Sequence, residues 1–186
     1  LRRTLRLVSS ERANPIRGSP YTWDDIFGFD GKIPLFTYKY VGEQTVLCLN
    51  NGKLKAETVD RKNYPFHPIT HYNEEFETTD CWVIEITPKD KRYPQSRKTV
   101  WVDKTRYWCI YAQMYDKKGD FWKGFWNGSQ ARPLKTPYGE ESYRIQCGSG
   151  ISDFKTFFWV VTVTGELLMN LGADPNLFQP GSLGTF

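Results

Sequence analysis

Histidine is scarce in this chain, with only two among 186 residues, His67 and His71. Their i, i+4 spacing suits a metal site on a helix, but Pro68 directly follows His67 and no glutamate lies between the two histidines, unlike the zincin pattern. The four cysteines have no CxxC spacing and no histidine nearby, which also disfavours zinc. The sequence therefore predicts no metal and no cofactor.

The cysteines leave their redox state open. They are Cys48, Cys81, Cys109 and Cys147. Up to two disulfides can form among them, in more than one connectivity. Cys81 and Cys109 lie in apolar, strand-like runs, where a free, buried thiol is equally expected.

Long apolar runs are also absent. The longest, FFWVVTV at 157–163, has the length of a strand, whereas a transmembrane helix needs roughly 18 or more consecutive apolar residues. The sequence therefore predicts a chain that does not span a membrane. It begins at LRRT, with neither Met nor an apolar signal segment, so we expect a processed or truncated protein whose natural N-terminus is missing.

Catalysis requires titratable groups that converge, and the sequence offers little sign of them. CGSGISD around Cys147 lacks the strand-turn-helix context of a nucleophile turn, so we interpret it as a Gly-rich connection. Asp24–Asp25 and Glu74–Glu75 are adjacent acids in expected loops. The prediction is a protein that is not an enzyme; a hydrolase that pairs His67 or His71 with an acid is the less favoured alternative.

Charge is nearly balanced, with 25 basic and 21 acidic residues and a formal net charge of +4. The basic residues gather in LRRTLRLVSSERANPIR at the start and in PKDKRYPQSRK further along. Solvated strand ends and a polar loop explain both clusters better than a lipid-headgroup or nucleic-acid patch.

Aromatic residues, by contrast, are abundant: seven Trp, eleven Tyr and twelve Phe make up 16% of the chain, which favours strands. Strands are expected over three early segments: 2–8, 35–40 and 44–49. A bend at Val41–Gly42 separates the last two, and Asn50–Asn51–Gly52 forms a turn. TWDDIFGF predicts one helical turn, capped by Thr22 and packed over the sheet. Residues 53–78 are expected to form a covering loop.

The clearest pattern lies between residues 81 and 126. Four apolar runs of strand length alternate with polar turns: 81–87, 98–103, 107–115 and 121–126. Residues 88–97 should form a long loop, Lys104–Thr105–Arg106 a tight one, and Asp116–Gly119 a hairpin turn. The pattern predicts an antiparallel meander. A final strand over 154–164 is apolar on both faces, so we expect it to be central or covered on both sides.

Side chains alternate along a strand, so the meander has two faces. One face is uniformly apolar and contains no Lys or Arg among its nine positions, which disfavours nucleic acid: Trp82, Ile84, Ile86, Val100, Val102, Trp108, Ile110, Ala112 and Met114. Helix signals are too few to cover such a sheet. A sheet rolled on itself or an apolar ligand would cover it, and an ordinary filled core is the simpler alternative.

The meander CWVIEITPKDKRYPQSRKTVWVDKTRYWCIYAQMYDKKGDFWKGF resembles the second half of a LolA/LolB-like domain. WDDIFGFDGKIPLFTYKYVGEQTVL, the opening LRR and the closing LFQPGSLG fit the same group. The chain is most similar to a proteobacterial domain-of-unknown-function family labelled outer membrane lipoprotein-sorting protein, and the similarity covers most of it.

The resemblance implies a half-open, incomplete antiparallel β-barrel, with one or two short helices and long loops over its concave face. It also implies binding or carriage of lipid, lipoprotein acyl chains or another apolar ligand in the periplasm, with association at the outer membrane. An envelope protein or transporter would be the partner. Residues 1–186 would form a single domain that lacks an N-terminal portion of a longer protein.

A second hypothesis keeps the apolar face as ordinary core. The chain would then be a structural or interaction module of a cell-envelope assembly, gripping a partner through exposed Trp101, Trp122 or Trp126.

Overall fold

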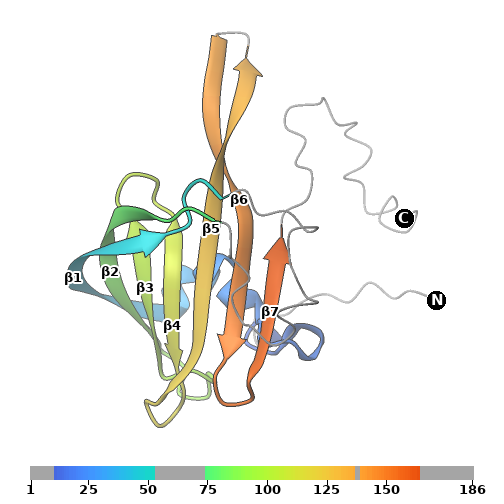
Figure 1. Cartoon of the computed structure of the whole chain (residues 1–186). Helices are drawn as coiled ribbons and strands as arrows, with labels where there is room; N and C mark the ends of the chain where they lie inside the picture. The colour runs from blue at the N-terminus through green and yellow to red at the C-terminus, as the bar shows by residue number, and fades with distance from the viewer. Residues whose placement is uncertain (1–10, 53–73, 137–138, 164–186) are drawn as a thin grey trace, which may run out of the picture.

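The computed structural model describes residues 11–52, 74–136 and 139–163. Seven strands form one antiparallel sheet, in which each strand pairs with its neighbours in sequence (Figure 1). The strands are β1 (Phe36–Cys48), β2 (Glu77–Pro88), β3 (Arg97–Asp103), β4 (Cys109–Tyr115), β5 (Phe121–Thr136), β6 (Gly139–Asp153) and β7 (Phe158–Val163). The described part before β1 contains the short 3-10 helices η2 (Ile16–Gly18), η3 (Trp23–Gly28) and η4 (Ile33–Leu35).

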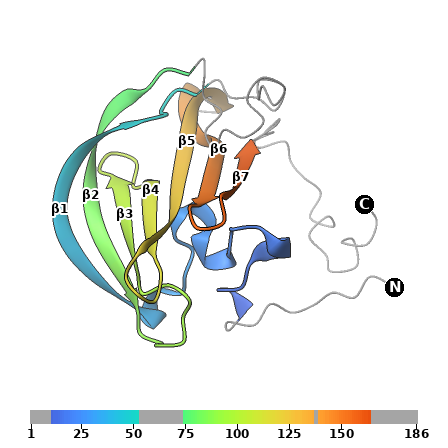
Figure 2. The ribbon, with the colours of Figure 1, turned by 60° about the horizontal axis from the view of Figure 1, so that its bottom comes forward.

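β1 and β7 are the two edges of the sheet, so within the described residues the sheet does not close into a barrel. The strands curve around the segment that precedes them (Figure 2). We call this segment, residues 11–35, the plug. The expected half-open antiparallel sheet with short helices over its concave face is confirmed.

The predicted runs 81–87 and 98–103 lie within β2 and β3, and Gly119 supplies the expected positive φ, +87°, in the β4–β5 turn. The β3–β4 turn is held by Asp103, whose Oδ1 accepts from the backbone N–H groups of Thr105 and Arg106 at 2.7 and 3.1 Å. Local turn chemistry therefore sets the order of the meander, as the sequence indicates.

β1 is one continuous strand rather than two. Its pairing with β2 shifts between Tyr40 and Gly42, at the expected bend, and Gly42 has a φ of +152°. A bulge of this kind bends a strand without ending it. The predicted strand over 2–8, both histidines and most of the predicted covering loop lie outside the described residues.

Two expectations for the C-terminal half are wrong. CGSGISD is not a connection but the end of β6, which pairs with β5 in a long hairpin. Glycine is depleted in strands, yet here it makes room: a Cβ on Gly150 would lie 2.3 Å from Trp126 Nε1. The strand expected over 154–164 starts at Phe158, and in the described part of the chain this strand, β7, lies at the edge of the sheet rather than in its centre.

Candidate functional site

The plug packs on the concave face of the sheet. Tyr21 is 8% exposed and meets Phe125 edge-on, with ring centroids 6.4 Å apart. Its hydroxyl lies 3.2 Å from Ser149 Oγ on β6. The buried sheet residues that form a core cluster with Tyr21 are Phe36, Ile86, Val100, Ala112, Met114, Phe125 and Ile151.

A buried charged cluster also ties η3 to β3 and β5. Lys98 Nζ lies 2.9 Å from Oδ1 of the fully buried Asp25, and Gln95 Nε2 donates to the same oxygen over 3.0 Å. Lys123 Nζ lies 3.9 Å from Asp25 Oδ2. Burial alone would raise the pKa of Asp25, but the two ammonium groups outweigh it and hold the pKa below its ordinary value. The carboxylate is therefore ionised at neutral pH.

A second set of ion pairs lies within the plug. Arg12 Nε is 2.8 Å from Asp24 Oδ1, and its Nη2 is 2.7 Å from Asp30 Oδ2. Tyr93, from the β2–β3 loop, donates to Asp24 Oδ2 over 3.0 Å. These contacts stabilise the conformation of the plug, in addition to its attachment to the sheet.

Beside the plug, the concave face contains an apolar groove of about 520 Å³. Aliphatic side chains of β2 and β3 line it: Ile84, Ile86, Val100 and Val102. The plug, β1, the β3–β4 turn and the start of β4 supply the rest of its lining: Phe29, Asp30, Gly31, Ile33, Tyr38, Tyr107 and Cys109. Ile33 and Tyr107 are 69% and 76% exposed, so this lining reaches the solvent. The volume falls within the roughly 300–1,000 Å³ of typical ligand pockets.

The structure brings four of the nine predicted site residues together in this groove: Ile84, Ile86, Val100 and Val102. Ala112 and Met114 share the core cluster with Val100 but are 1% and 0% exposed, and neither lines the groove. Trp82 is half-buried, and its ring centroid lies 5.7 Å from that of Tyr107, which lines the groove.

Trp108 and Ile110 do not share the face of the other seven. They pack in a separate cluster with Cys48 and Cys81. The register of β3 and β4 shifts between Trp101 and Val102, where strict alternation fails. The irregularity puts Cys109 in the groove and Ile110 in the other cluster, because one extra residue reverses the side-chain alternation.

The sequence reasoning missed the two buried lysines of the concave face. Lys98 precedes Val100 and Val102 at the same period-two spacing, and it is only 3% exposed. Lys123 pairs with Met114 in the β4–β5 register and is also 3% exposed. Extending the alternation by one step in β3 would have placed Lys98 on the apolar face.

All four cysteines are free thiols. Cys109 lines the apolar groove, and burial raises its pKa to about 12. A thiol with such a pKa stays protonated at neutral pH and is a poor nucleophile. Cys109 therefore adds apolar surface to the groove rather than reactivity.

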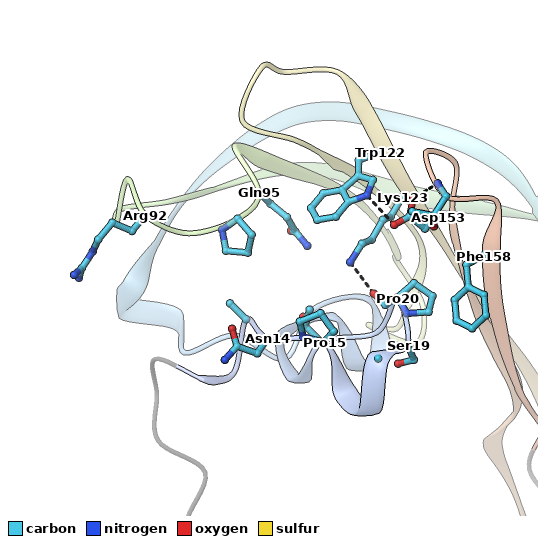
Figure 3. Close-up of a pocket in the computed structure, with 15 residues that line it drawn as sticks. Asn14, Pro15, Ser19, Pro20, Arg92, Gln95, Trp122, Lys123, Asp153 and Phe158 are labelled. Atoms are coloured by element: carbon cyan, nitrogen blue, oxygen red, sulfur yellow. Dashed lines mark hydrogen bonds between the residues drawn. The ribbon is translucent and has the colours of Figure 1, made fainter.

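A second hollow, of about 530 Å³, lies between the plug, the β2–β3 loop and strands β5 and β6; we call it the Lys123 pocket (Figure 3). Lys123 extends from β5 and donates to the Pro20 carbonyl of the plug over 2.7 Å. Asp153 of β6 pairs directly opposite Lys123 and accepts from Trp122 Nε1 over 2.9 Å. The pocket thus combines buried charges with an aromatic wall.

The prediction that Trp101, Trp122 and Trp126 are exposed is wrong, because all three are half-buried. Trp101 Nε1 donates to Gln44 Oε1 over 2.7 Å, which holds its ring against the sheet.

In the described part of the chain, no group of three or more His, Cys, Asp or Glu side chains is placed to hold a metal. Nor does any described helix have the length and apolarity needed to cross a membrane.

Two solved structures align with this chain. A domain described as an outer membrane lipoprotein-sorting protein from Vibrio parahaemolyticus aligns with 95% of this chain at 17% identity and a TM-score of 0.56. A DUF1329 family protein from Desulfovibrio piger aligns with 94% at 17% identity and a TM-score of 0.48. The chain spans 59% and 57% of their respective lengths.

No curated protein matches the sequence. The Vibrio domain shares the fold of this chain, which confirms the fold that the lipoprotein-sorting resemblance implied. Residues 2–160 match the family model described as "Protein of unknown function (DUF1329)". With most of its length matched, the chain belongs to the DUF1329 family.

Proposed function

We propose that this chain binds and carries an apolar ligand, a lipid or the acyl chain of a lipoprotein, in the apolar groove. The observation that carries the proposal is the groove itself: about 520 Å³ over the aliphatic side chains of β2 and β3. Burial of an alkyl chain there would contribute roughly 25 cal/mol per Å² of apolar surface. Selectivity among chains should be loose, because the hydrophobic effect is not directional.

The architecture supports reversible binding. Within the described residues, β1 and β7 are edges of a sheet that does not close, and the plug lies beside the groove rather than across all of it. Exposed Ile33 and Tyr107 offer an apolar path from the groove to the surface. A ligand could thus enter and leave without unfolding of the sheet.

The setting of this activity is part of the proposal. The structural neighbour from Vibrio is described as an outer membrane lipoprotein-sorting protein domain. By analogy, we place this chain in the periplasm, associated with the outer membrane, where it would exchange its ligand with an envelope protein or transporter. In this role the chain carries its ligand and does not act as an enzyme.

Binding of a fluorescent fatty acid to the purified chain, together with mass spectrometry of co-purifying lipid, tests the proposal. Val102 lines the groove and is half-buried. Val102→Asp places a carboxylate against the ligand and should abolish uptake, because an unpaired charge in apolar surroundings is strongly unfavourable. Val102→Trp fills the groove without adding charge and should also weaken uptake.

Leu47→Asp is the matched control. Leu47 is an aliphatic residue of β1 that is 60% exposed and lies outside the groove. The control should bind fatty acid like the unmodified chain. Equal uptake by all three variants, or no co-purifying lipid and no uptake by the unmodified chain, would refute the groove as the binding site.

A further inference from the structure

Lys123 has hydrogen-bonding capacity that the described residues do not use. Its ammonium has three N–H donors, yet the Pro20 carbonyl at 2.7 Å is its one acceptor within hydrogen-bond range among those residues. The nearest carboxylate oxygen, on Asp25, is 3.9 Å away, and the Trp122 ring centroid is 4.3 Å away. A charge that is 97% removed from solvent normally has more partners.

Thr22 presents a second unused donor in the same pocket. The residue is 3% exposed and lines the Lys123 pocket. Its hydroxyl proton has no acceptor within the part of the chain that the structure describes. The Lys123 ammonium can only donate, and the Thr22 hydroxyl can donate as well as accept, so one hydrogen-bond acceptor in the pocket would satisfy both.

The acids near Lys123 are already engaged by other donors. Asp25 Oδ1 accepts from Lys98 and Gln95, and its Oδ2 accepts from the Thr22 backbone N–H over 3.3 Å. Asp153 accepts from Trp122 Nε1 at 2.9 Å and from two backbone N–H groups of the β6–β7 turn at 2.9 and 3.0 Å. Among the described residues, Lys123 therefore makes no hydrogen bond to a carboxylate, although Asp25 and Asp153 lie nearby.

We propose that the Lys123 pocket binds an organic anion whose charged group is a phosphate, with Lys123 Nζ and the Thr22 hydroxyl donating to its oxygens. The pocket, at about 530 Å³, has room for more than a bare ion. Trp122, Phe158 and three prolines of its lining offer apolar contact to the rest of the molecule. The inference does not depend on the function of the apolar groove, whose lining residues are different.

Isothermal titration of the full chain with inorganic phosphate, butyl phosphate and octyl phosphate, beside neutral 1-butanol, tests the proposal. Lys123→Met should weaken butyl phosphate binding about tenfold or more, the loss expected when a hydrogen bond to a charged group is removed. Thr22→Val, which removes only the hydroxyl, should weaken it less. Circular dichroism verifies that both variants fold.

Lys118→Met is the matched control, because Lys118 is an exposed lysine on the β4–β5 turn that does not line the pocket. It should leave butyl phosphate binding unchanged. Val102→Asp, the groove variant, should also leave it unchanged, so a failure of the pocket and a failure of the groove give different results.

The three anions separate the possible sources of the phosphate. If affinity rises from inorganic phosphate to octyl phosphate and stays sensitive to Lys123→Met, the pocket takes the headgroup of an amphiphile. If inorganic phosphate binds as tightly as the esters, it takes free phosphate. Affinity for 1-butanol equal to that for butyl phosphate, no binding of any anion, or folded variants that bind as well as the unmodified chain would overturn the proposal.

Discussion

The ammonium of Lys98 on β3 reaches three acceptors of η3 at once: Asp25 Oδ1 at 2.9 Å, the Gly28 carbonyl at 2.9 Å and the Asp24 carbonyl at 3.2 Å. Lys98 thus connects β3 to three residues of η3 through hydrogen bonds. Because Lys98 and Asp25 are 3% and 0% exposed, this pairing occurs where an unpaired charge is most unfavourable.

Asp25→Ala should therefore be strongly destabilising. It leaves Lys98 and Lys123 buried without their carboxylate, and breaking a buried pair in this way costs about 3–5 kcal/mol. Urea unfolding followed by circular dichroism measures the loss. Asp90→Ala is the control, since Asp90 pairs with Arg92 at the surface, where no measurable change is expected. Similar unfolding midpoints for both variants would contradict a structural role for the cluster.

Acid should weaken the same contact. The pKa of Asp25 in the folded protein lies below its ordinary value of 3.8, so its ionised form stabilises the fold above that pH. The contribution is lost as pH falls through the folded pKa. The stability advantage of the unmodified chain over Asp25→Asn should hold at pH 7 and shrink below about pH 4 in urea unfolding series. An advantage that does not change with pH would show that the Asp25 charge does not stabilise the fold.

Lys123 should make stability depend on pH in the alkaline range. Burial lowers its pKa below the ordinary 10.5, more than Asp25 and Asp153 raise it, and Lys98 lowers it further. Between the folded pKa and 10.5 the unfolded chain binds the proton more tightly, so stability rises with pH there. The unmodified chain should gain stability relative to Lys123→Met as pH approaches 10.5, measured by urea unfolding. A constant difference would contradict a lowered pKa.

Gly28 should tolerate no side chain. It has a φ of +86°, and a Cβ there would lie 2.3 Å from Cys109 Sγ. Gly28→Ala combines backbone strain of about 1 kcal/mol with a clash at the apolar groove, so its unfolding temperature should fall clearly. Gly18→Ala separates the two effects, because Gly18 has a φ of +76° but no atom within 4 Å of the added Cβ. If both variants melt alike, the clash has no effect.

The sheet was predictable from sequence where alternation and turn residues agree. Both signals coincide between residues 81 and 126, and the strands there follow the predicted order. Alternation and turn residues conflict in β6, where Gly148 and Gly150 are typical of a connection between strands. There, the space that Trp126 needs overrides the low strand propensity of glycine, and only the packed structure shows this.

The site was predictable only in part, for a related reason. Alternation correctly grouped Ile84, Ile86, Val100 and Val102, but a single register shift moved Ile110 to another cluster. Alternation could place Lys98 on the apolar face, but its buried partner could not be predicted, because the carboxylate that Lys98 and Lys123 approach comes from the plug. Asp25 lies 73 residues from Lys98 in sequence.

That separation has a kinetic consequence. Each strand pairs with its sequence neighbour, so the sheet can assemble through successive local hairpins. The plug is synthesised before the sheet, yet its anchors on β3, β5 and β6 lie 73, 103 and 128 residues away. We expect the plug to dock last and to open first, with amide hydrogens of η3 exchanging faster than those of β3 to β5. The concave face of the sheet would thus form before the plug packs onto it.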